Sequence, residues 1–534
     1  MFKYYLLIAW RNSRCNKLYA SISIVGLTLG LTAALLIGLF VQDELSYDSW
    51  LPDHQELYRA YSVSGDRRFG SGPVELGRWL KSDYPQVTAV ARLLGSSTVV
   101  GVDQDSSELE FNERVDWADP EVFDVFPFSS IHGDLAGALD QPDAVVISKS
   151  IAEKYFGTDD AVGESLLFGR ENPMQVTAVI ADLPDNTHLD FEILGSANAA
   201  FSPIAVQDRS PINQYYGRKS WLTSTYFRLP ATENLANITD DMGAMLDRHL
   251  PVQGGRKNSE IYQIELRPIT DVHLTTGDAT ATGVNLQNVY TVSAVALLIL
   301  ITASINYINL MTARGAKRSR EIAIRKTVGA GRKSLIFQFL TESTTYVLIS
   351  CVFAVGLAAL LLAPFNGFMS REMNFSIVLS PGFLLGALSI AVLTSLVAGI
   401  YPALVLSRFT PMALFQTNKP KGSSAFIREA LSVFQFAILT ALLVSAYVIY
   451  QQGQFGFRES VRQLDDPIVM ITTNGCADQL KQQFLQVPNV KSVGCATQIP
   501  QYGMGWGLRS CPRARRRLSG SGLPTIRSTA IFFS

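Results

Sequence analysis

Five stretches without a charged residue limit what this chain can fold into, because each is long enough to cross a bilayer. They are Leu18–Val41, Val289–Met311, Thr344–Pro364, Phe383–Leu406 and Leu431–Tyr450. A helix needs about 20 apolar residues to cross a hydrocarbon core of roughly 30 Å. Buried helices of soluble proteins run about 8–20 residues, so five such stretches in one chain predict a membrane protein.

The first stretch is interpreted as a retained helix and not as a cleaved signal peptide. The apolar core of a signal peptide is about 7–15 residues long. Leu18–Val41 is longer than that, and the acidic pair Asp43-Glu44 follows it where a signal peptide has a cleavage site with small residues. We therefore expect the chain to keep this helix as its first span.

The charges alternate between the segments that connect the five stretches. Residues 1–17 hold four basic residues and no acid, residues 312–343 hold eight basic residues against two acids, and residues 407–430 hold four against one. Residues 42–288 hold 18 basic and 38 acidic residues, a net charge of −20. Because basic flanks stay in the cytoplasm, we expect the amphipathic N-terminus (1–17) and the linker (407–430) to be cytoplasmic and residues 42–288 to be extracytoplasmic.

Residues 42–288 are long enough to form a domain with a core of its own. Five runs are typical of strands: Thr98–Val102, Ala144–Ile147, Gln175–Ile180, Thr225–Leu229 and Ile261–Leu266. Three are typical of helices: Val74–Leu80, Lys149–Phe156 and Thr239–Leu250. The mixture predicts an α/β or α+β domain. The fold class that follows is a multi-pass α-helical membrane protein with one large extracytoplasmic domain.

No catalytic or metal-binding pattern stands out in this domain. It contains all five histidines of the chain, and none has the spacing of a metal ligand set. The histidines are interpreted as polar loop residues: His54, His132, His188, His249 and His273. No nucleophile elbow is present either, so we expect no catalytic residue, no metal and no cofactor.

The segment 312–343, called the elbow below, is predicted to contain a short basic helix at the cytoplasmic mouth of the bundle. Ser319 is a suitable N-cap, and Glu321 in the first turn favours the helix dipole. Gly329 and Gly331 are expected to end the helix. A simpler interpretation is that its basic residues only fix the topology and touch lipid headgroups. Gly329–Ser334 resembles a phosphate loop, but Arg332 occupies the position of the required glycine.

Small and polar residues in the first two spans indicate helix contacts. Gly26, Gly30, Ala34 and Gly38 follow one another four residues apart, a spacing that lets a second backbone approach closely. Asn306 and Asn309 lie near the end of the second span, and polar groups there usually face other helices. No span contains a charged residue or a histidine, which argues against a proton- or ion-coupled transporter.

Several phrases in a fixed order resemble the permease subunits of MacB/FtsX-type ABC transporters. In the extracytoplasmic segment they are Ala144–Gly157 and Asp182–Phe191. Residues 289–415 are similar to the FtsX-type module through Asn306–Met311, Glu321–Lys326 with Gly329-Ala330, Gln338–Ser343, Ala398–Ala403 and Phe409–Pro411. Together the similar regions cover roughly residues 1–503.

The resemblance implies a partner ABC-type ATPase on a separate chain, and hence no ATP hydrolysis by this one. It implies that the elbow docks on that ATPase through Arg318, Arg320, Glu321, Ile322, Ile324, Arg325, Lys326 and Gly329. ATP-driven motion would then reach the outer domain mechanically, in a bacterial inner membrane, for export or extraction of antimicrobials, peptides or lipoproteins. Membrane lipid, a second permease copy or a periplasmic adaptor are further expected partners, and nucleic acid is not.

The C-terminal part is expected to begin a second repeat that then breaks off. Arg428–Phe436 opens the fifth span as Arg11–Ile24 opens the first, and residues 451–503 would start a second outer domain. From residue 479 onward the chain holds no acid, and six arginines follow Gly503. We hypothesise a frameshift near residue 503, which would make residues 504–534 an aberrant basic tail; a real basic tail is the alternative.

Two other function classes stay open on the sequence alone. A membrane-anchored sensor would use the outer domain to bind a ligand and the elbow to signal inward. An enzyme with an outer catalytic domain is disfavoured by the missing catalytic pattern.

Overall fold

The computed structural model describes residues 17–533 except for 65–66, 103–109, 211–222, 232, 253–254, 276–284, 314–323, 330, 370, 372, 374, 376–377, 379, 408–422, 463–468, 474–477, 489, 491 and 497–528. The chain divides into two compact units, Met1–Val433 and Phe434–Ser534. The first unit combines a bundle of long apolar helices with a domain built on one large mixed sheet, called the mixed-sheet domain (residues 46–275) below.

The mixed-sheet domain contains an 11-stranded sheet with short helices around it. Its strands are β1 (Leu57–Ser64), β2 (Arg67–Phe69), β3 (Ala89–Val102), β4 (Glu110–Ala118), β5 (Ser130–His132), β6 (Ala144–Ser148), β7 (Ser165–Phe168), β8 (Asn172–Ile180), β9 (Ile193–Ser196), β10 (Ser224–Arg228) and β11 (Gln263–Pro268). Its helices are η1 (His54–Glu56), α3 (Leu76–Asp83), α4 (Val122–Val125), α5 (Lys149–Phe156), α6 (Pro203–Arg209), α7 (Leu235–His249), η2 (Asn258–Glu260) and η3 (Ile269–Asp271).

Half of this sheet closes on itself. The pairing runs from β3 through β4, β9, β6, β8 and β7 back to β3, and all of these pairs except β4–β9 and β6–β8 are antiparallel. Val115 and Trp117 alternate inward along β4 and pack with Phe168 and Met174. A Cβ atom at Gly195 would lie 2.8 Å from the Trp117 ring, so only glycine lets the indole cross β9.

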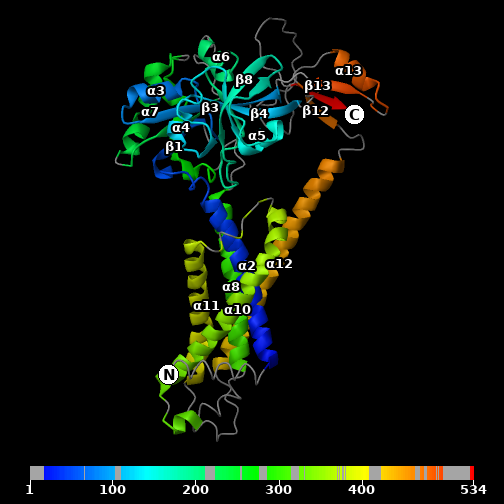
Figure 1. The fold of residues 1–534 in the computed structure, drawn as a ribbon. Coiled ribbons are helices and arrows are strands. Elements are labelled where there is room, and N and C mark those ends of the chain that lie inside the picture. Colours follow the sequence, from blue (N-terminus) through cyan, green and yellow to red (C-terminus); the bar gives the residue numbers. More distant parts are fainter. Residues whose placement is uncertain are drawn as a thin grey trace. The chain divides into compact units, whose positions relative to one another are not determined.

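The other half of the sheet, in the order β11, β1, β10 and β3, is covered by α3 and α7, which lie together beside it (Figure 1). Helix α7 buries Ile238, Met242, Met245 and Leu246, which recur at helical spacing. These side chains pack with Phe227 and with residues of β1 and β11 in one apolar core. The two halves share strand β3, and besides the core of each half a third apolar core joins them, in which Tyr61 of β1 packs in the same cluster as Val146 of β6.

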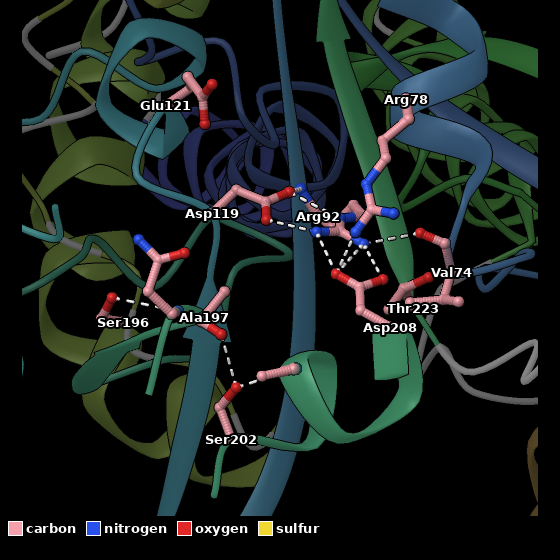
Figure 2. A network of polar contacts seen from close by, with 12 residues as sticks. Val74, Arg78, Arg92, Asp119, Glu121, Ser196, Ala197, Ser202, Asp208 and Thr223 are labelled. Atoms are coloured by element: carbon pink, nitrogen blue, oxygen red, sulfur yellow. Dashed lines mark hydrogen bonds and ion pairs between the residues drawn. The ribbon is translucent and has the colours of Figure 1, made fainter. Parts of the chain in front are cut away.

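A buried arginine connects the two halves, and its partners are drawn in Figure 2. Arg92 of β3 donates two hydrogen bonds of 2.8 Å to the two carboxylate oxygens of Asp119, through Nε and Nη2. Its Nη1 lies 3.0 Å from Asp208 Oδ1, on α6, and 2.9 Å from the Val74 carbonyl, before α3. Arg78 of α3 also contacts Asp208. Arg92 therefore fixes α6, which packs on the closed half, to the segment that covers the open half.

Long helices make up most of the other described residues of the first unit. They are α2 (Lys17–Leu45), α8 (Leu286–Ala313), α10 (Arg332–Met369), α11 (Pro381–Ser407) and the first part of α12 (Ser423–Arg462). Four described helical segments are long and apolar enough to cross a membrane: Lys17–Leu45, Leu286–Ala313, Arg332–Met369 and Arg428–Gly456. A shorter apolar stretch, Pro381–Val397, overlaps the fourth predicted span. Together with the mixed-sheet domain, these helices confirm the predicted fold class.

The second unit holds the remainder of α12 and a small sheet. The strands β12 (Val469–Thr473), β14 (Thr529–Phe533) and β13 (Val493–Ala496) pair in that order, and α13 (Asp478–Leu485) lies between β12 and β13 in the chain. Strand β14 belongs to the segment for which the sequence predicts an aberrant tail. Residues 497–528, which include most of that segment, lie outside the described residues.

Candidate functional site

Helices α2, α8, α10 and α11 lie side by side and contact one another (Figure 1). The stripe of small residues on α2 faces α8 at two positions. A Cβ atom at Gly30 would lie 2.6 Å from the Ala303 Cβ, and one at Gly26 would lie 3.2 Å from Asn306 Nδ2. Ala34 is buried, and Gly38 lies near Phe383 of α11. The close approach of α2 and α8 therefore depends on the missing side chain at Gly30.

A second close approach joins α10 to α11, and sequence reasoning did not single it out. A Cβ atom at Gly399 would overlap Ser343 Oγ and would lie 3.0 Å from Leu340 Cδ2. Near it, the Thr344 and Ser395 hydroxyls form a hydrogen bond of 2.7 Å. Two of the phrases on which the family resemblance rests, Gln338–Ser343 and Ala398–Ala403, thus meet where these helices touch.

The second asparagine of α8 makes a polar contact between helices. Asn309 Nδ2 donates to Ser432 Oγ of α12 at 3.2 Å. Both residues belong to the first unit.

The described part of the elbow is one helical turn followed by the start of α10. Arg325 Nη1 donates to Gln338 Oε1 on α10 at 2.6 Å, and the Gln338 side chain is buried. On the same turn, Ile324 and Val328 are 59% and 83% exposed. Gly329 has a φ of 98°, which ends the turn. Lys326 lies in this turn, whereas Arg318, Arg320, Glu321 and Ile322 lie outside the described residues.

The chain enters the mixed-sheet domain through a tight turn after α2. Asp48 in this turn has a φ of 59°, and its side chain is completely buried. Its Oδ1 accepts hydrogen bonds from the Thr187 hydroxyl at 2.6 Å and from the His188 amide at 3.1 Å. Its Oδ2 lies 2.8 Å from His188 Nδ1, and the Asp48 amide donates to the Asn186 carbonyl. Asn186, Thr187 and His188 lie within the family phrase Asp182–Phe191, so this phrase holds the entry turn.

Burial and hydrogen bonding have opposite effects on the Asp48 carboxyl. Burial raises its pKa, but the charge and hydrogen bonds of His188 and the hydrogen bond of Thr187 outweigh burial and hold the pKa below its usual 3.8. His188 Nε2 lies 3.0 Å from the Tyr226 hydroxyl on β10. Because Tyr226 packs in the core of the domain, the entry turn is bonded through His188 to the sheet.

This pKa shift predicts a pH dependence of stability. A depressed pKa stabilises the fold fully above pH 3.8 and ceases to do so as the pH falls through the folded-state pKa. We expect Asp48→Asn to lower the free energy of unfolding by about 2 kcal/mol at neutral pH, and the difference from wild type to shrink as the pH falls below 3.8. Urea unfolding of the full chain in detergent, followed by tryptophan fluorescence, measures this. The control is Asp240→Asn at an exposed position of α7. A difference that stays constant from neutral pH to pH 3 would contradict the role of Asp48.

The interpretation of the histidines as polar loop residues missed two buried pairs. His188 pairs with Asp48, and His273 Nε2 lies 2.6 Å from Glu44 Oε2. Both acids and His273 are buried, and the His188 side chain is only 9% exposed. Nothing in the local sequence marks these pairs, because the partners are more than a hundred residues apart. Among the residues that the structure describes, no three His, Cys, Asp or Glu side chains are grouped so that they could hold a metal ion.

Comparison with known proteins identifies two regions of the chain. Residues 20–245 match the family model of the MacB-like periplasmic core domain, and residues 293–411 match that of the FtsX-like permease C-terminal domain. The mixed-sheet domain falls largely within the first match, and α8, the elbow, α10 and α11 within the second.

Curated relatives are similar to parts of this chain. The macrolide export ATP-binding/permease protein MacB of Pasteurella multocida is 26% identical over 270 residues, which are 50% of this chain and 37% of that protein. The protein of the same name from Agrobacterium fabrum is 31% identical over 121 residues, 23% of this chain and 18% of that protein. The chain therefore matches only 37% and 18% of the length of these two relatives.

The solved structure of the periplasmic region of MacB from Actinobacillus actinomycetemcomitans is 15% identical in sequence, with a TM-score of 0.29. The similar region is 41% of this chain and 90% of that structure. The two family models follow each other along the chain in the order in which the sequence phrases occur. The chain, with its apolar helices and its extracytoplasmic mixed-sheet domain, belongs to the MacB/FtsX-type ABC transporter permeases.

Proposed function

We propose that this chain is the transmembrane subunit that transmits ATP-driven motion of a separate ATPase subunit to the mixed-sheet domain. The elbow is the docking surface for the ATPase, and the N-terminus lies in the cytoplasm of a bacterial cell with the mixed-sheet domain outside the inner membrane. The segregation of charge supports this orientation, because residues 42–288 carry a net charge of −20 while the elbow is basic.

The hydrogen bond from Arg325 to Gln338 carries the proposal. It joins the described turn of the elbow to α10. At about 1.5 Å per residue, the 38 residues of α10 extend over roughly 57 Å, well beyond the roughly 30 Å of a bilayer core. A displacement of the elbow is therefore passed to one continuous helix that reaches the opposite side of the membrane.

The elbow turn has a surface suited to a protein partner. Ile324 and Val328 are one helical turn apart and largely exposed, beside the basic residues Arg325 and Lys326. An apolar pair flanked by charges is typical of a docking helix, in which apolar contact gives affinity and charge gives orientation. The relatives are named ATP-binding/permease proteins, which supports an ATPase as the partner.

The cargo is inferred only as a class. The matched relatives are named macrolide export proteins, and the family resemblance includes lipoprotein extraction. We propose export or extraction of antimicrobials, peptides or lipoproteins, driven by motion of the mixed-sheet domain.

Reversal of two charges in the elbow tests the proposal. In Arg325→Glu with Lys326→Glu, the bond to Gln338 is lost and the basic surface becomes acidic. We expect the amount of ATPase that co-purifies from membranes to fall by about tenfold or more, because like charges across an interface cost several kcal/mol. The amount of chain in the membrane fraction should stay unchanged.

The matched control reverses an adjacent basic pair on the mixed-sheet domain, in Arg256→Glu with Lys257→Glu. The Arg256 side chain is 63% exposed, pairs with the Glu260 carboxylate and donates to the Glu260 carbonyl on the surface, so ATPase recovery should equal that of the wild type. Equal recovery with the elbow variant, or no ATPase with the wild type, would contradict the proposed function. The second outcome would favour the sensor alternative.

A further inference from the structure

Four side chains from three separate segments meet at the base of the mixed-sheet domain. Glu44 lies at the end of α2, and Tyr47 follows it in the entry turn. His273 follows η3, where the chain leaves the domain toward α8, and Arg371 lies between α10 and α11. We call Glu44, Tyr47, His273 and Arg371 the junction clamp.

The four residues form a closed cycle of contacts. Glu44 Oε2 accepts from His273 Nε2 at 2.6 Å, and Glu44 Oε1 accepts from Arg371 Nη2 at 2.9 Å. The second guanidinium nitrogen, Nη1, donates to the Tyr47 hydroxyl. The Tyr47 ring stacks on the His273 ring with 3.4 Å between the ring centroids and 8° between the planes. Each member therefore contacts two others.

Burial makes this cycle cooperative. Glu44 is completely buried, and each of its carboxylate oxygens has one cationic or ring N–H partner. A buried carboxylate that loses one partner keeps its desolvation cost without the compensating interaction. Burial lowers the pKa of Arg371, but the nearby Tyr47 and Glu44 outweigh it and raise the pKa, so the guanidinium is held in its charged form. Loss of one contact therefore weakens the others.

The three segments link the mixed-sheet domain to the long helices. Residues 44–47 belong to the segment that connects α2 to the domain, and His273 belongs to the segment that connects the domain to α8. Arg371 is joined to the last turn of α10, because its amide donates to the Asn366 carbonyl at 3.1 Å. Helix α10 is also the helix that receives the hydrogen bond from the elbow.

We propose that the junction clamp delivers the motion of α10 to the mixed-sheet domain, and that Arg371 is the positioning residue that couples the two. Tyr47 precedes Asp48, whose bonds to Thr187 and His188 lead into the sheet. A shift of the α10–α11 segment thus acts on the entry turn and through it on the core of the domain. This inference rests on the proposed function, since it assumes that the elbow drives α10.

The test separates ATP hydrolysis from motion of the entry turn. The full chain, with the ATPase that co-purifies with it, is placed in lipid nanodiscs. Hydrolysis is measured, and amide hydrogen exchange is measured with MgATP, with a non-hydrolysable ATP analogue and without nucleotide. The amides of Asp48, Ser49 and Leu51 are hydrogen-bonded within the entry turn or to Asn186, so their exchange reports its opening.

In the wild type we expect nucleotide to change exchange at these amides. In Arg371→Gln this nucleotide-dependent change should fall by about tenfold, the ratio expected for loss of a charge-assisted hydrogen bond, while hydrolysis stays within about twofold of the wild type. Arg371→Lys should give a nucleotide-dependent change in exchange between those of the wild type and Arg371→Gln, because lysine keeps the positive charge but lacks the two guanidinium nitrogens that donate to Glu44 and Tyr47. The control is Arg170→Gln, which removes an exposed ion pair with Glu110 and should behave as the wild type.

A purely structural role of Arg371 would alter exchange equally with and without nucleotide. That result, or a wild-type nucleotide response in Arg371→Gln, would overturn the clamp, as would a parallel loss of hydrolysis. If Arg371→Gln does not insert into membranes, Tyr47→Phe replaces it in the experiment, because it removes only the hydroxyl that accepts from Arg371. A nucleotide-dependent change in exchange equal to that of the wild type in Tyr47→Phe would then overturn the proposal. If the wild type binds ATPase through the elbow and the clamp variants respond normally, only this inference fails; if the wild type recovers no ATPase, the proposed function fails and the clamp with it.

Discussion

Replacing Arg92 with methionine is expected to lower the free energy of unfolding of the mixed-sheet domain by about 3 kcal/mol. The substitution keeps an unbranched side chain in place but removes the guanidinium that Asp119 and Asp208 share (Figure 2). Removing one partner of a buried ion pair costs about 3–5 kcal/mol, and we take the lower value because these carboxylates are 16% and 19% exposed. At about 2–4 °C per kcal/mol for a domain of this size, the melting temperature should fall by roughly 6–12 °C.

Thermal unfolding of the full chain in detergent, followed by tryptophan fluorescence, measures this effect. The matched control is Arg170→Met, because the Arg170–Glu110 ion pair is on the surface and such pairs contribute about 0–1 kcal/mol. A second comparison is the triple variant with Asp119→Asn and Asp208→Asn added to Arg92→Met, which should recover part of the loss because position 119 no longer holds a carboxylate without a cation; Asp208 also contacts Arg78. Equal melting temperatures for Arg92→Met and Arg170→Met would show that Arg92 does not hold the two halves of the sheet together.

Replacing Gly30 with leucine is expected to prevent the normal packing of α2 against α8. Even the first atom of the new side chain would lie 2.6 Å from the Ala303 Cβ, closer than carbon atoms approach in proteins, and the Ile299 carbonyl lies 3.8 Å away. Because a side chain of this size cannot be placed between the helices, they must separate along their contact. We expect the amount of intact chain in membranes to fall severalfold, since destabilised proteins are degraded in cells.

Quantitative immunoblotting of the membrane fraction measures the amount of chain, and limited proteolysis measures its folding. The control is Gly356→Leu on α10, where, among the described residues, no atom beyond the adjoining backbone and neighbours of the same helix lies within 4 Å of the added Cβ. It introduces the same side chain into an apolar helix without a steric conflict, so its amount should equal that of the wild type. Normal amounts and normal protease resistance of Gly30→Leu would refute the close contact between α2 and α8.

Local sequence patterns were sufficient for much of the fold. The five predicted strand runs lie in or overlap β3, β6, β8, β10 and β11, and the predicted helix Lys149–Phe156 coincides with α5. These elements follow from apolar spacing and, for α5, from the Ser148 cap and the glycine at residue 157. The order of the sequence phrases also predicted the family. The coupling role of the elbow remains a prediction, and half of its predicted residues lie outside the described part of the chain.

Pairing over long distances in the sequence could not be predicted in this way. The closure of the sheet depends on β7, which pairs with both β3 and β8, and no local pattern specifies two partners for one short strand. Gly399 resembles the other glycines of the apolar helices until Ser343 of α10 is placed against it. The sequence marks the histidines at positions 188 and 273 only as polar loop residues. Their pairing with acids could not be predicted, because the acidic partners precede them by 140 and 229 residues.

The sequence by itself determined that this is a membrane protein with a large extracytoplasmic domain, and to which family it belongs. The length of an apolar stretch, the charge of its flanks and the spacing of apolar residues are each defined within about twenty consecutive residues, so the sequence alone shows them. Only the tertiary structure decided that Glu44, Tyr47, His273 and Arg371 meet, and that Arg92 holds two halves of one sheet. Buried charges are tolerated only where distant segments supply partners, so their role becomes visible once the chain has folded.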